Sequence, residues 1–261
     1  MTCIWCVPHL KSVSWLASTD MNSGLVALGD ELTHECVTVP QDGPDVCPVC
    51  RGQRDDTMRI CESCALCESQ LSNLHPVVPI SLYAKPSPMR DRVRYYKDSD
   101  DLAERWRLGR EVAALVERFF VEHRDYLEGR FDRWDAACIV PSAEREAPHP
   151  LERALIDHTA GACGRLETLL RRGTGEIGHR RANHQAFEPV GRVQGRRVLL
   201  LDDVLTTGAR CQSAARALTT AGADVVLIVV VARRINPDWR PEAGPWWKRQ
   251  IETPFSWSTR P

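Results

Sequence analysis

The sequence predicts an α/β protein in which a parallel β-sheet is flanked by helices on both faces. Three short runs, at 136–140, 198–201 and 225–231, are apolar at every position. Strands that are buried on both faces have this pattern, whereas strands with one wet face alternate apolar and polar residues. Longer segments with helical periodicity lie between the runs, and parallel strands need such crossover connections. The runs and the segments between them together favour a parallel sheet.

Composition restricts the class of protein. The chain has 261 residues, of which 43% are apolar and 26% charged, as in globular proteins. Its 34 basic and 35 acidic residues give a net charge of −1, which excludes a globally basic nucleic-acid binder but allows a local basic patch. The longest apolar run, Val225 to Ala232, is much shorter than the roughly 20 residues of a membrane-spanning helix. With no signal peptide at the start, we expect a soluble cytoplasmic protein.

Four parts follow one another along the chain. Residues 1–46 have no sustained period and form an extension of uncertain order. Residues 47–70 are rich in cysteine, residues 71–235 carry the α/β pattern, and residues 236–261 are rich in proline and tryptophan. The length suits one such domain with a small appendage.

The helices and strands of the main part are predicted in order. A strand is expected at 79–83, and apolar residues at helical spacing predict a helix from about 101 to 123. The strand at 136–140 ends at Pro141, and a second helical stretch is expected over 151–170. After the strand at 198–201, a helix is predicted over 208–221 with Gly222 at its C-cap, followed by the strand at 225–231.

The C-terminal 26 residues contain five prolines and four tryptophans. Prolines at this density predict that no regular helix forms. One interpretation is a tail that wraps on its own domain and buries some of its tryptophans. The alternative is an arm that docks a protein partner.

The most informative segment is residues 198–209, where a buried strand is expected to end in the adjacent carboxylates of Asp202 and Asp203. A short loop with Thr206 and Thr207 follows, and Gly208 opens a helix. Open α/β sheets bind ligands at the carboxyl ends of their strands, and a helix N-terminus suits a phosphate.

The two ends of this segment suit different chemical groups. The carboxylates can accept hydrogen bonds from a sugar diol, or hold Mg²⁺ bound to it. The threonine hydroxyls can donate to a phosphate, and Gly208 lets the backbone approach it closely. A ribose 5-phosphate has this polarity.

The segment closely resembles the phosphoribosyl-pyrophosphate (PRPP) loop of type I phosphoribosyltransferases. The resemblance implies that Asp202 and Asp203 bind the ribose 2′- and 3′-hydroxyls and that PRPP is bound with Mg²⁺. It also implies a cradle for the 5′-phosphate, which consists of Leu205, Thr206, Thr207, Gly208 and Ala209. Hypoxanthine-type purine salvage enzymes usually have aspartate where Thr206 stands, and a threonine hydroxyl is a poor general base, so purine salvage of that type is disfavoured.

The arrangement of the chain over residues 47–235 resembles the ComF family, in which a cysteine knuckle precedes a phosphoribosyltransferase-like domain. Residues 180–187, Arg-Arg-Ala-Asn-His-Gln-Ala-Phe, are similar to a stretch before that family's PRPP strand, and 139–142, Ile-Val-Pro-Ser, to the strand that leads to its pyrophosphate loop. The family usually continues with an Arg-Gly-Phe-Asn-Gln-type stretch. Here residues 147–154 read Ala-Pro-His-Pro-Leu-Glu-Arg-Ala, so the chain is identified as a divergent relative.

A basic stretch supports a polyanionic ligand. Residues 171–197 contain seven arginines and two glutamates, and guanidinium groups suit phosphates through paired hydrogen bonds. For most of these arginines a solvated basic face is the simpler interpretation. Candidates for the pyrophosphate side are Ser142, Arg145, Arg180 and Arg181. The same patch could contact nucleic-acid phosphates.

The cysteines crowd one end of the chain, which favours a metal site over a disulfide scaffold. Two Cys-x-x-Cys pairs, Cys47 with Cys50 and Cys61 with Cys64, complete a tetrahedral set for a structural Zn²⁺ in a zinc-ribbon-like knuckle. Cys67 gives a second register for the later pair, and we favour Cys61 and Cys64.

A second zinc site is an additional hypothesis. Cys3 and Cys6 form a third Cys-x-x-Cys pair, and His34 and Cys36 lie further on. These residue types are zinc ligands, but the loop between the two pairs is long.

Two hypotheses for the function come from different classes. The first is Mg²⁺-dependent phosphoribosyl transfer from PRPP to an unknown nitrogen acceptor, which is a glycosyltransferase reaction. The second is a non-catalytic adaptor that binds PRPP or a nucleotide, linked to DNA uptake in competent bacteria or to nucleic-acid handling, as the ComF resemblance implies. A zinc-ribbon nucleic-acid binder is a weaker third alternative.

Overall fold

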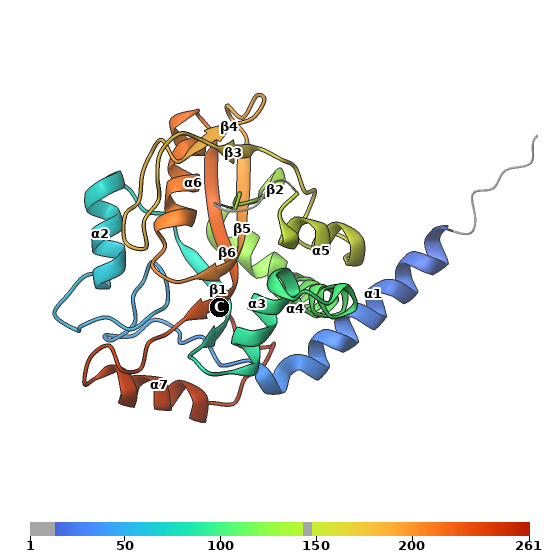
Figure 1. The fold of residues 1–261 in the computed structure, drawn as a ribbon, viewed down its shortest axis with the longest axis horizontal. Coiled ribbons are helices and arrows are strands. Elements are labelled where there is room, and N and C mark those ends of the chain that lie inside the picture. Colours follow the sequence, from blue (N-terminus) through green and yellow to red (C-terminus); the bar gives the residue numbers. More distant parts are fainter. Residues whose placement is uncertain (1–13, 143–147) are drawn as a thin grey trace, which may run out of the picture.

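The computed structural model describes residues 14–142 and 148–261 (Figure 1). Its centre is a four-stranded parallel sheet in the order β1-β6-β5-β2. The predicted α/β class with a parallel sheet flanked by helices is therefore confirmed. The strands are β1 (Val77–Tyr83), β2 (Ala136–Ile139), β5 (Arg197–Leu205) and β6 (Asp224–Arg234).

The sheet is apolar because both of its faces are covered. All seven residues of β1 and all four residues of β2 are buried. Along β5 the side chains alternate, so that Leu199 and Leu201 join one hydrophobic cluster while Val198 and Leu200 join another. Each face therefore needs its own layer of helices.

One layer consists of α3 (Pro88–Asp98), α4 (Leu102–Phe131) and α5 (Pro150–His158) (Figure 1). The predicted helix start at residue 101 is confirmed, because the Asp101 side chain accepts a hydrogen bond of 2.8 Å from the backbone N–H of Ala103. Helix α1 (Ser14–Glu31) packs on α4. A short 3₁₀ helix, Leu32–Glu35, then leads the chain towards β1.

The other layer is α6 (Ala209–Thr220), with α2 (Glu62–Leu71) packed against it. A small antiparallel pair, β3 (Leu170–Arg172) and β4 (Phe187–Pro189), lies at the outer end of this layer (Figure 1). No helix of the described residues is long and apolar enough to cross a membrane.

The prediction of a helix over 151–170 is wrong for the second half of that range. Helix α5 ends at His158, and the chain turns at Gly161 and Gly164, whose φ angles are +86° and +100°. The following residues add an edge to the sheet, since Leu166 bridges Ala137 in parallel. Left-handed glycines of this kind end a helix, whatever the apolar spacing beyond them.

The tail contains a helix, α7 (Ala243–Glu252), so the prediction that its prolines forbid one is wrong. Pro245 lies in the first turn, where the backbone N–H that proline lacks has no partner within the helix. Trp246 is 1% exposed and Trp257 is also buried, as expected for a tail that packs on its own domain. Trp239 remains half exposed.

Candidate functional site

The segment predicted to carry the chemistry lies at the carboxyl edge of the sheet. Strand β5 runs further than expected and ends only at Leu205, so Asp202 and Asp203 belong to the strand itself. Thr206 and Thr207 form a short turn, and Gly208, with a φ of +86°, precedes α6 as its N-cap residue. An L-residue with a side chain is strained in this conformation, which explains the glycine.

Asp202 is held by an arginine from the first turn of α6. Arg210 donates to both carboxylate oxygens of Asp202, with a distance of 3.1 Å from Nε to Oδ2. The backbone N–H of Asp203 donates to Oδ1 of Asp202 at 2.9 Å. Sequence analysis missed Arg210, although it directly follows the predicted cradle.

Asp203 faces the opposite layer and is held by α3. Its Oδ2 accepts hydrogen bonds from the Tyr96 hydroxyl, at 2.7 Å, and from the Lys97 ammonium. Its Oδ1 accepts from Arg210 at 3.2 Å. Buried His149 at the N-cap of α5 adds a further electrostatic interaction with Asp203. Nothing in the local sequence around Tyr96 or Lys97 pointed to this contact, because it joins residues more than a hundred positions apart.

Burial and charge shift the two carboxyl groups in opposite directions. Burial raises the pKa of Asp202 to about 6, with repulsion by Asp203 adding to the shift and Arg210 opposing it. Asp203 is as deeply buried, but Lys97 and Arg210 hold its pKa well below the ordinary value. Asp203 is therefore the permanent anion of the pair.

A pH dependence of stability follows for Asp202. Its pKa in the folded protein is about 6 and its ordinary value is 3.8, so the folded state binds the proton more tightly. Its contribution to stability is fully present below the ordinary value and is lost as pH rises through about 6. Urea unfolding of the natural protein and Asp202→Asn should give a stability difference that changes between about pH 4 and about pH 6. A constant difference across this range would contradict the raised pKa.

The acidic pair does not fit a divalent cation in this arrangement. Each of its four carboxylate oxygens accepts a hydrogen bond, and Arg210 and Lys97 already balance the two negative charges. A hard cation such as Mg²⁺ needs several oxygen ligands that are not engaged by cationic groups. The pair therefore offers no ready Mg²⁺ site.

The turn after β5 has the features of a phosphate cradle. The side chains of Leu205 and Ala209 are buried, so these two residues could contribute only backbone groups. Helix α6 has no side-chain cap, which leaves its first N–H groups without a side-chain acceptor. Thr207 donates its hydroxyl to the carbonyl oxygen of His179.

The residues predicted to contact the pyrophosphate lie in different parts of the structure. Ser142 follows β2, whose Ile139 pairs with Leu201, and therefore lies at the same edge of the sheet as the acidic pair. Arg180 pairs with Glu62 of α2 at 3.3 Å, and Arg181 is exposed. Arg145 lies outside the described residues.

The predicted four-cysteine site is confirmed as a cluster that could hold zinc. The sulfur atoms of Cys47, Cys50, Cys61 and Cys64 all lie within 4.8 Å of one another, and all four residues are buried. Cys67 lies elsewhere, with its thiol 3.7 Å from the carbonyl oxygen of Thr207. The favoured register, with Cys61 and Cys64 as the second pair, is therefore the observed one.

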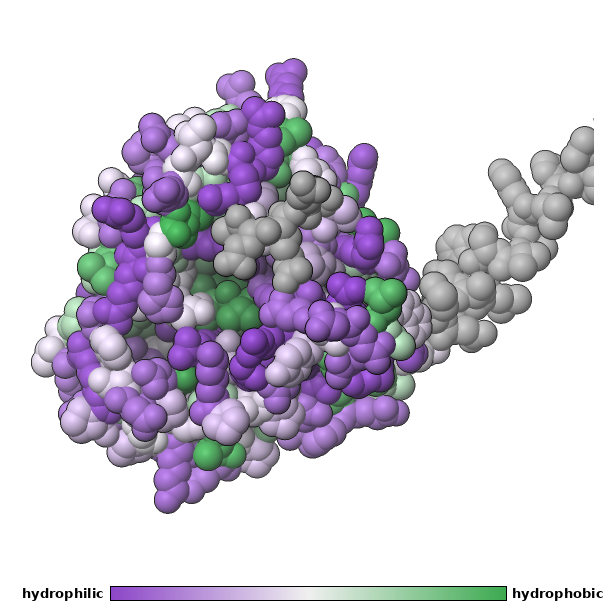
Figure 2. Space-filling view, viewed as in Figure 1, coloured by the Kyte–Doolittle hydropathy of each residue, from purple (hydrophilic) through white to green (hydrophobic). Residues whose placement is uncertain are grey.

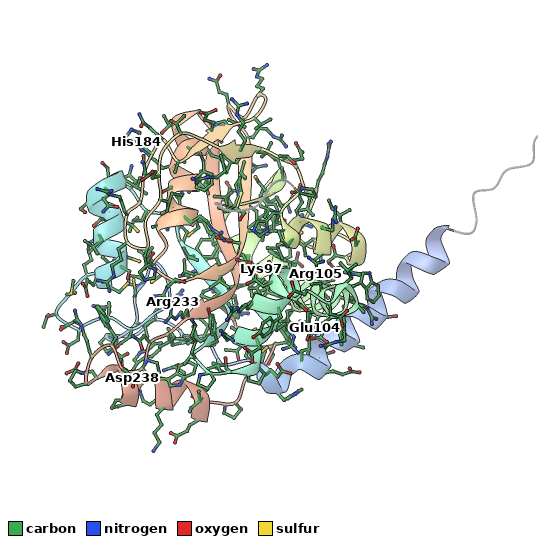
Figure 3. All side chains as sticks on the ribbon, in the orientation of Figure 1. Lys97, Glu104, Arg105, His184, Arg233 and Asp238 are labelled. Carbon is green, nitrogen blue, oxygen red and sulfur yellow. The ribbon has the colours of Figure 1, made fainter. Side chains whose placement is uncertain are left out.

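Arg233 links this cluster to the sheet. It is the penultimate residue of β6, is 6% exposed, and packs so closely on Gly52 that a side chain at position 52 would collide with its guanidinium. The four cysteines raise its pKa against the opposing effect of burial. Four thiolates around a bound Zn²⁺ would carry a net charge of −2, which this guanidinium would partly balance. Arg233 and Lys97 lie at the same edge of the sheet (Figure 3).

The second zinc site stays a prediction, because Cys3 and Cys6 lie outside the described residues. His34 is largely exposed, with Nδ1 2.7 Å from the carbonyl oxygen of Glu31. Cys36 is buried, and its thiol donates to the carbonyl oxygen of Leu32 at 3.6 Å. Burial raises the pKa of Cys36 to about 12, so its thiol stays protonated in this environment.

No protein-family model matches the chain, and no curated protein matches it. Solved structures to which it is similar include orotate phosphoribosyltransferase of Mycobacterium tuberculosis H37Rv in complex with Fe(III) dicitrate, at 16% identity and a TM-score of 0.34 over 80% of this chain and 84% of that one. A phosphoribosyltransferase of Corynebacterium diphtheriae shares 20% identity over 49% and 77%, with a TM-score of 0.29. UMP synthase of Leishmania donovani shares 21% identity over 53% and 27%, with a TM-score of 0.27, so the chain spans about a quarter of that protein.

Proposed function

We propose that the chain binds PRPP and transfers its phosphoribosyl group to a nitrogen acceptor, as a divergent relative of the ComF family. The observation that carries the proposal is the turn Thr206–Gly208, at the carboxyl end of a buried parallel strand and directly before α6. Hydroxyl groups, a left-handed glycine and an uncapped helix N-terminus meet there, and all three suit a phosphate. The α/β part at 71–235 would carry the activity, and the knuckle at 47–70 would support it.

Binding would exchange partners at the acidic pair. Arg210 belongs to the first turn of α6, so a phosphate in the turn offers its guanidinium a new anionic partner. Its departure would free the oxygens of Asp202 for the ribose hydroxyls. Asp203 would stay ionised through Lys97 and Tyr96. The deep burial of the pair is thus compatible with a diol site that opens on phosphate binding.

The transfer step follows from the chemistry of PRPP. A nitrogen lone pair of the acceptor forms the bond to the ribose C1, while the bond from C1 to the pyrophosphate oxygen breaks and pyrophosphate leaves with that electron pair. Positive charge grows on the ribose during the step, and the carboxylates of Asp202 and Asp203 would stabilise it. Ser142 and Arg145 would contact the pyrophosphate. Dependence on Mg²⁺ remains a prediction, and the acidic pair is not the group that would hold the ion.

One observation favours the second candidate function, a non-catalytic binder. In the described arrangement Arg210 and Lys97 occupy the carboxylates of the acidic pair. The two carboxylates therefore have their charges balanced without a bound sugar. A sensor or adaptor could use PRPP or a nucleotide only to release Arg210. Pyrophosphate release separates the two functions, because a binder would take up PRPP without turnover.

Calorimetric titration with PRPP, with and without Mg²⁺, tests the proposal. We expect saturable binding to the natural protein and at least about tenfold weaker binding to Thr206→Val/Thr207→Val, since hydrogen bonds to charged groups contribute about 1.5–3 kcal/mol. Thr219→Val is the matched control, because the Thr219 hydroxyl only bonds to carbonyls of its own helix. Unaltered affinity in the double variant, or no binding by the folded natural protein, would overturn the proposal.

A further inference from the structure

A cavity of about 930 Å³ opens beside the turn Thr206–Thr207, at the carboxyl end of β6. Parts of the chain far apart in sequence form its walls. The N-terminus of α2 and the knuckle lie on one side, and the tail around Trp239 and Trp246 lies on another. Figure 2 shows that hydrophilic residues cover most of the viewed face, with smaller hydrophobic patches between them. A volume of this order suits a small-molecule ligand.

The tail gives the cavity a flat aromatic wall. Trp239 lines it and is 49% exposed, and the guanidinium of Arg180 lies over its ring, 4.5 Å from the centroid. Pro241 and Pro245 line the same wall. A half-exposed indole in a cavity is a surface on which a planar ring can stack. The aromatic wall therefore favours a planar ligand.

Most arginines that line the cavity already have a partner. Arg180 and Arg240 both pair with Glu62, at 3.3 and 3.0 Å, and Arg249 pairs with Asp45. Arg54 donates to backbone carbonyl groups of the knuckle, including that of Val46 at 2.8 Å. These side chains line the cavity, but their guanidinium groups already have partners and are less available to bind a ligand.

Arg234, the last residue of β6, differs from them. Across residues 14–142 and 148–261 its side chain makes no hydrogen bond or ion pair, although it lines the cavity. Its interaction with Lys85 is unfavourable, because Arg234 lowers the pKa of Lys85, with smaller contributions from burial and from Arg90. A guanidinium without a partner beside a like charge gains most from an anionic ligand that it can bind through two hydrogen bonds.

We propose that this cavity is the acceptor site and that the acceptor is a planar aromatic carboxylate, with its ring against Trp239 and its acidic group on Arg234. The inference rests on the proposed function, because the ligand can act as an acceptor only when a phosphoribosyl group is bound at the neighbouring turn. Binding of an aromatic acid in the cavity does not itself require PRPP. The two claims can therefore fail separately.

Ligand-observed NMR with matched probe pairs tests this site. The probes are benzoate, pyridine-3-carboxylate and indole-3-carboxylate, each compared with its uncharged carboxamide. We expect at least one acid to bind about tenfold more tightly than its amide, because a hydrogen bond to a charged group contributes about 1.5–3 kcal/mol. Arg234→Gln should abolish this preference while the amide still binds. Trp239→Leu should weaken the acid and the amide alike.

Arg249→Gln is the matched control, since Arg249 lines the same cavity but is paired with Asp45, and it should keep the preference for the acid. Thermal unfolding checks that each variant is folded. The proposal is overturned if none of the acids binds, or if binding is indifferent to Arg234→Gln and Trp239→Leu. Titrating PRPP into the same variants keeps the claims apart. If the acids bind and PRPP does not, the proposed function is wrong and the assignment of the cavity still holds. If PRPP binds and the acids do not, the assignment of the cavity is wrong and the proposed function still holds.

Discussion

Cys50→Ser should lower the zinc content of the purified protein from one ion per chain to almost none. The sulfur atoms of the four cysteines are arranged as the ligands of a closed site, and the knuckle has little core of its own. Binding of structural Zn²⁺ contributes apparent free energies of about 10–16 kcal/mol in zinc-finger peptides, so even a fraction of that is large here. We expect the melting temperature to fall by about 10 °C or more, as for a loss of about 3–5 kcal/mol in a chain of this size.

Mass spectrometry of bound metal and differential scanning calorimetry measure the two effects. Cys67→Ser is the matched control, because Cys67 is as buried as the cluster cysteines and lies in the same helix as Cys64, but is not part of the cluster. It should retain zinc. Full zinc occupancy in Cys50→Ser, or its loss in Cys67→Ser, would contradict the assignment of the ligands.

Asp203→Asn should cost about 3–5 kcal/mol of stability, the usual penalty for removing one partner of a buried ion pair. Asp203 is fully buried and is the only anion in hydrogen-bond contact with Lys97 among the described residues. The substitution leaves the ammonium group of Lys97 without its counter-charge. The measurement is urea unfolding followed by circular dichroism.

A double-mutant cycle separates charge from packing at this position. Lys97→Met/Asp203→Asn should recover a large part of the stability, because the uncompensated ammonium is then gone. Tyr96→Phe, which removes a hydroxyl donor to the same carboxylate, should cost only about 1.5–3 kcal/mol. If Lys97→Met/Asp203→Asn were no more stable than Asp203→Asn, the ion pair would not be what stabilises this edge of the sheet.

The parts of the fold that could be predicted are those set by local pattern. The runs at 136–140, 198–201 and 225–231 are apolar throughout, and each became a strand buried on both faces. The cysteine cluster could be predicted because metal geometry restricts ligand spacing. The helix over 151–170 failed because its apolar spacing continues past the left-handed turns at Gly161 and Gly164.

The surroundings of the acidic pair could not be predicted, for a different reason. Lys97 and Tyr96 reach Asp203 only because α3 packs beside the end of β5, and no spacing in the sequence encodes that contact. Arg210 was within reach of prediction, since it follows the cradle by one residue, but a helix-borne arginine is ordinarily a solvated side chain. The aromatic wall at Trp239 likewise depends on how the tail folds back.

We propose that the turn after β5 holds the phosphate of a phosphorylated ribose. An amide NMR titration of the zinc-loaded protein with ribose 5-phosphate, compared with ribose and with inorganic phosphate, tests this placement. We predict that ribose 5-phosphate shifts the amide signals of Thr206, Thr207, Gly208 and Ala209 most strongly, with smaller changes at Asp202 and Asp203 as Arg210 changes partner. Ribose alone should leave the turn unshifted. Saturating shifts at another part of the molecule, or none in the turn, would show that the phosphate does not bind in this turn.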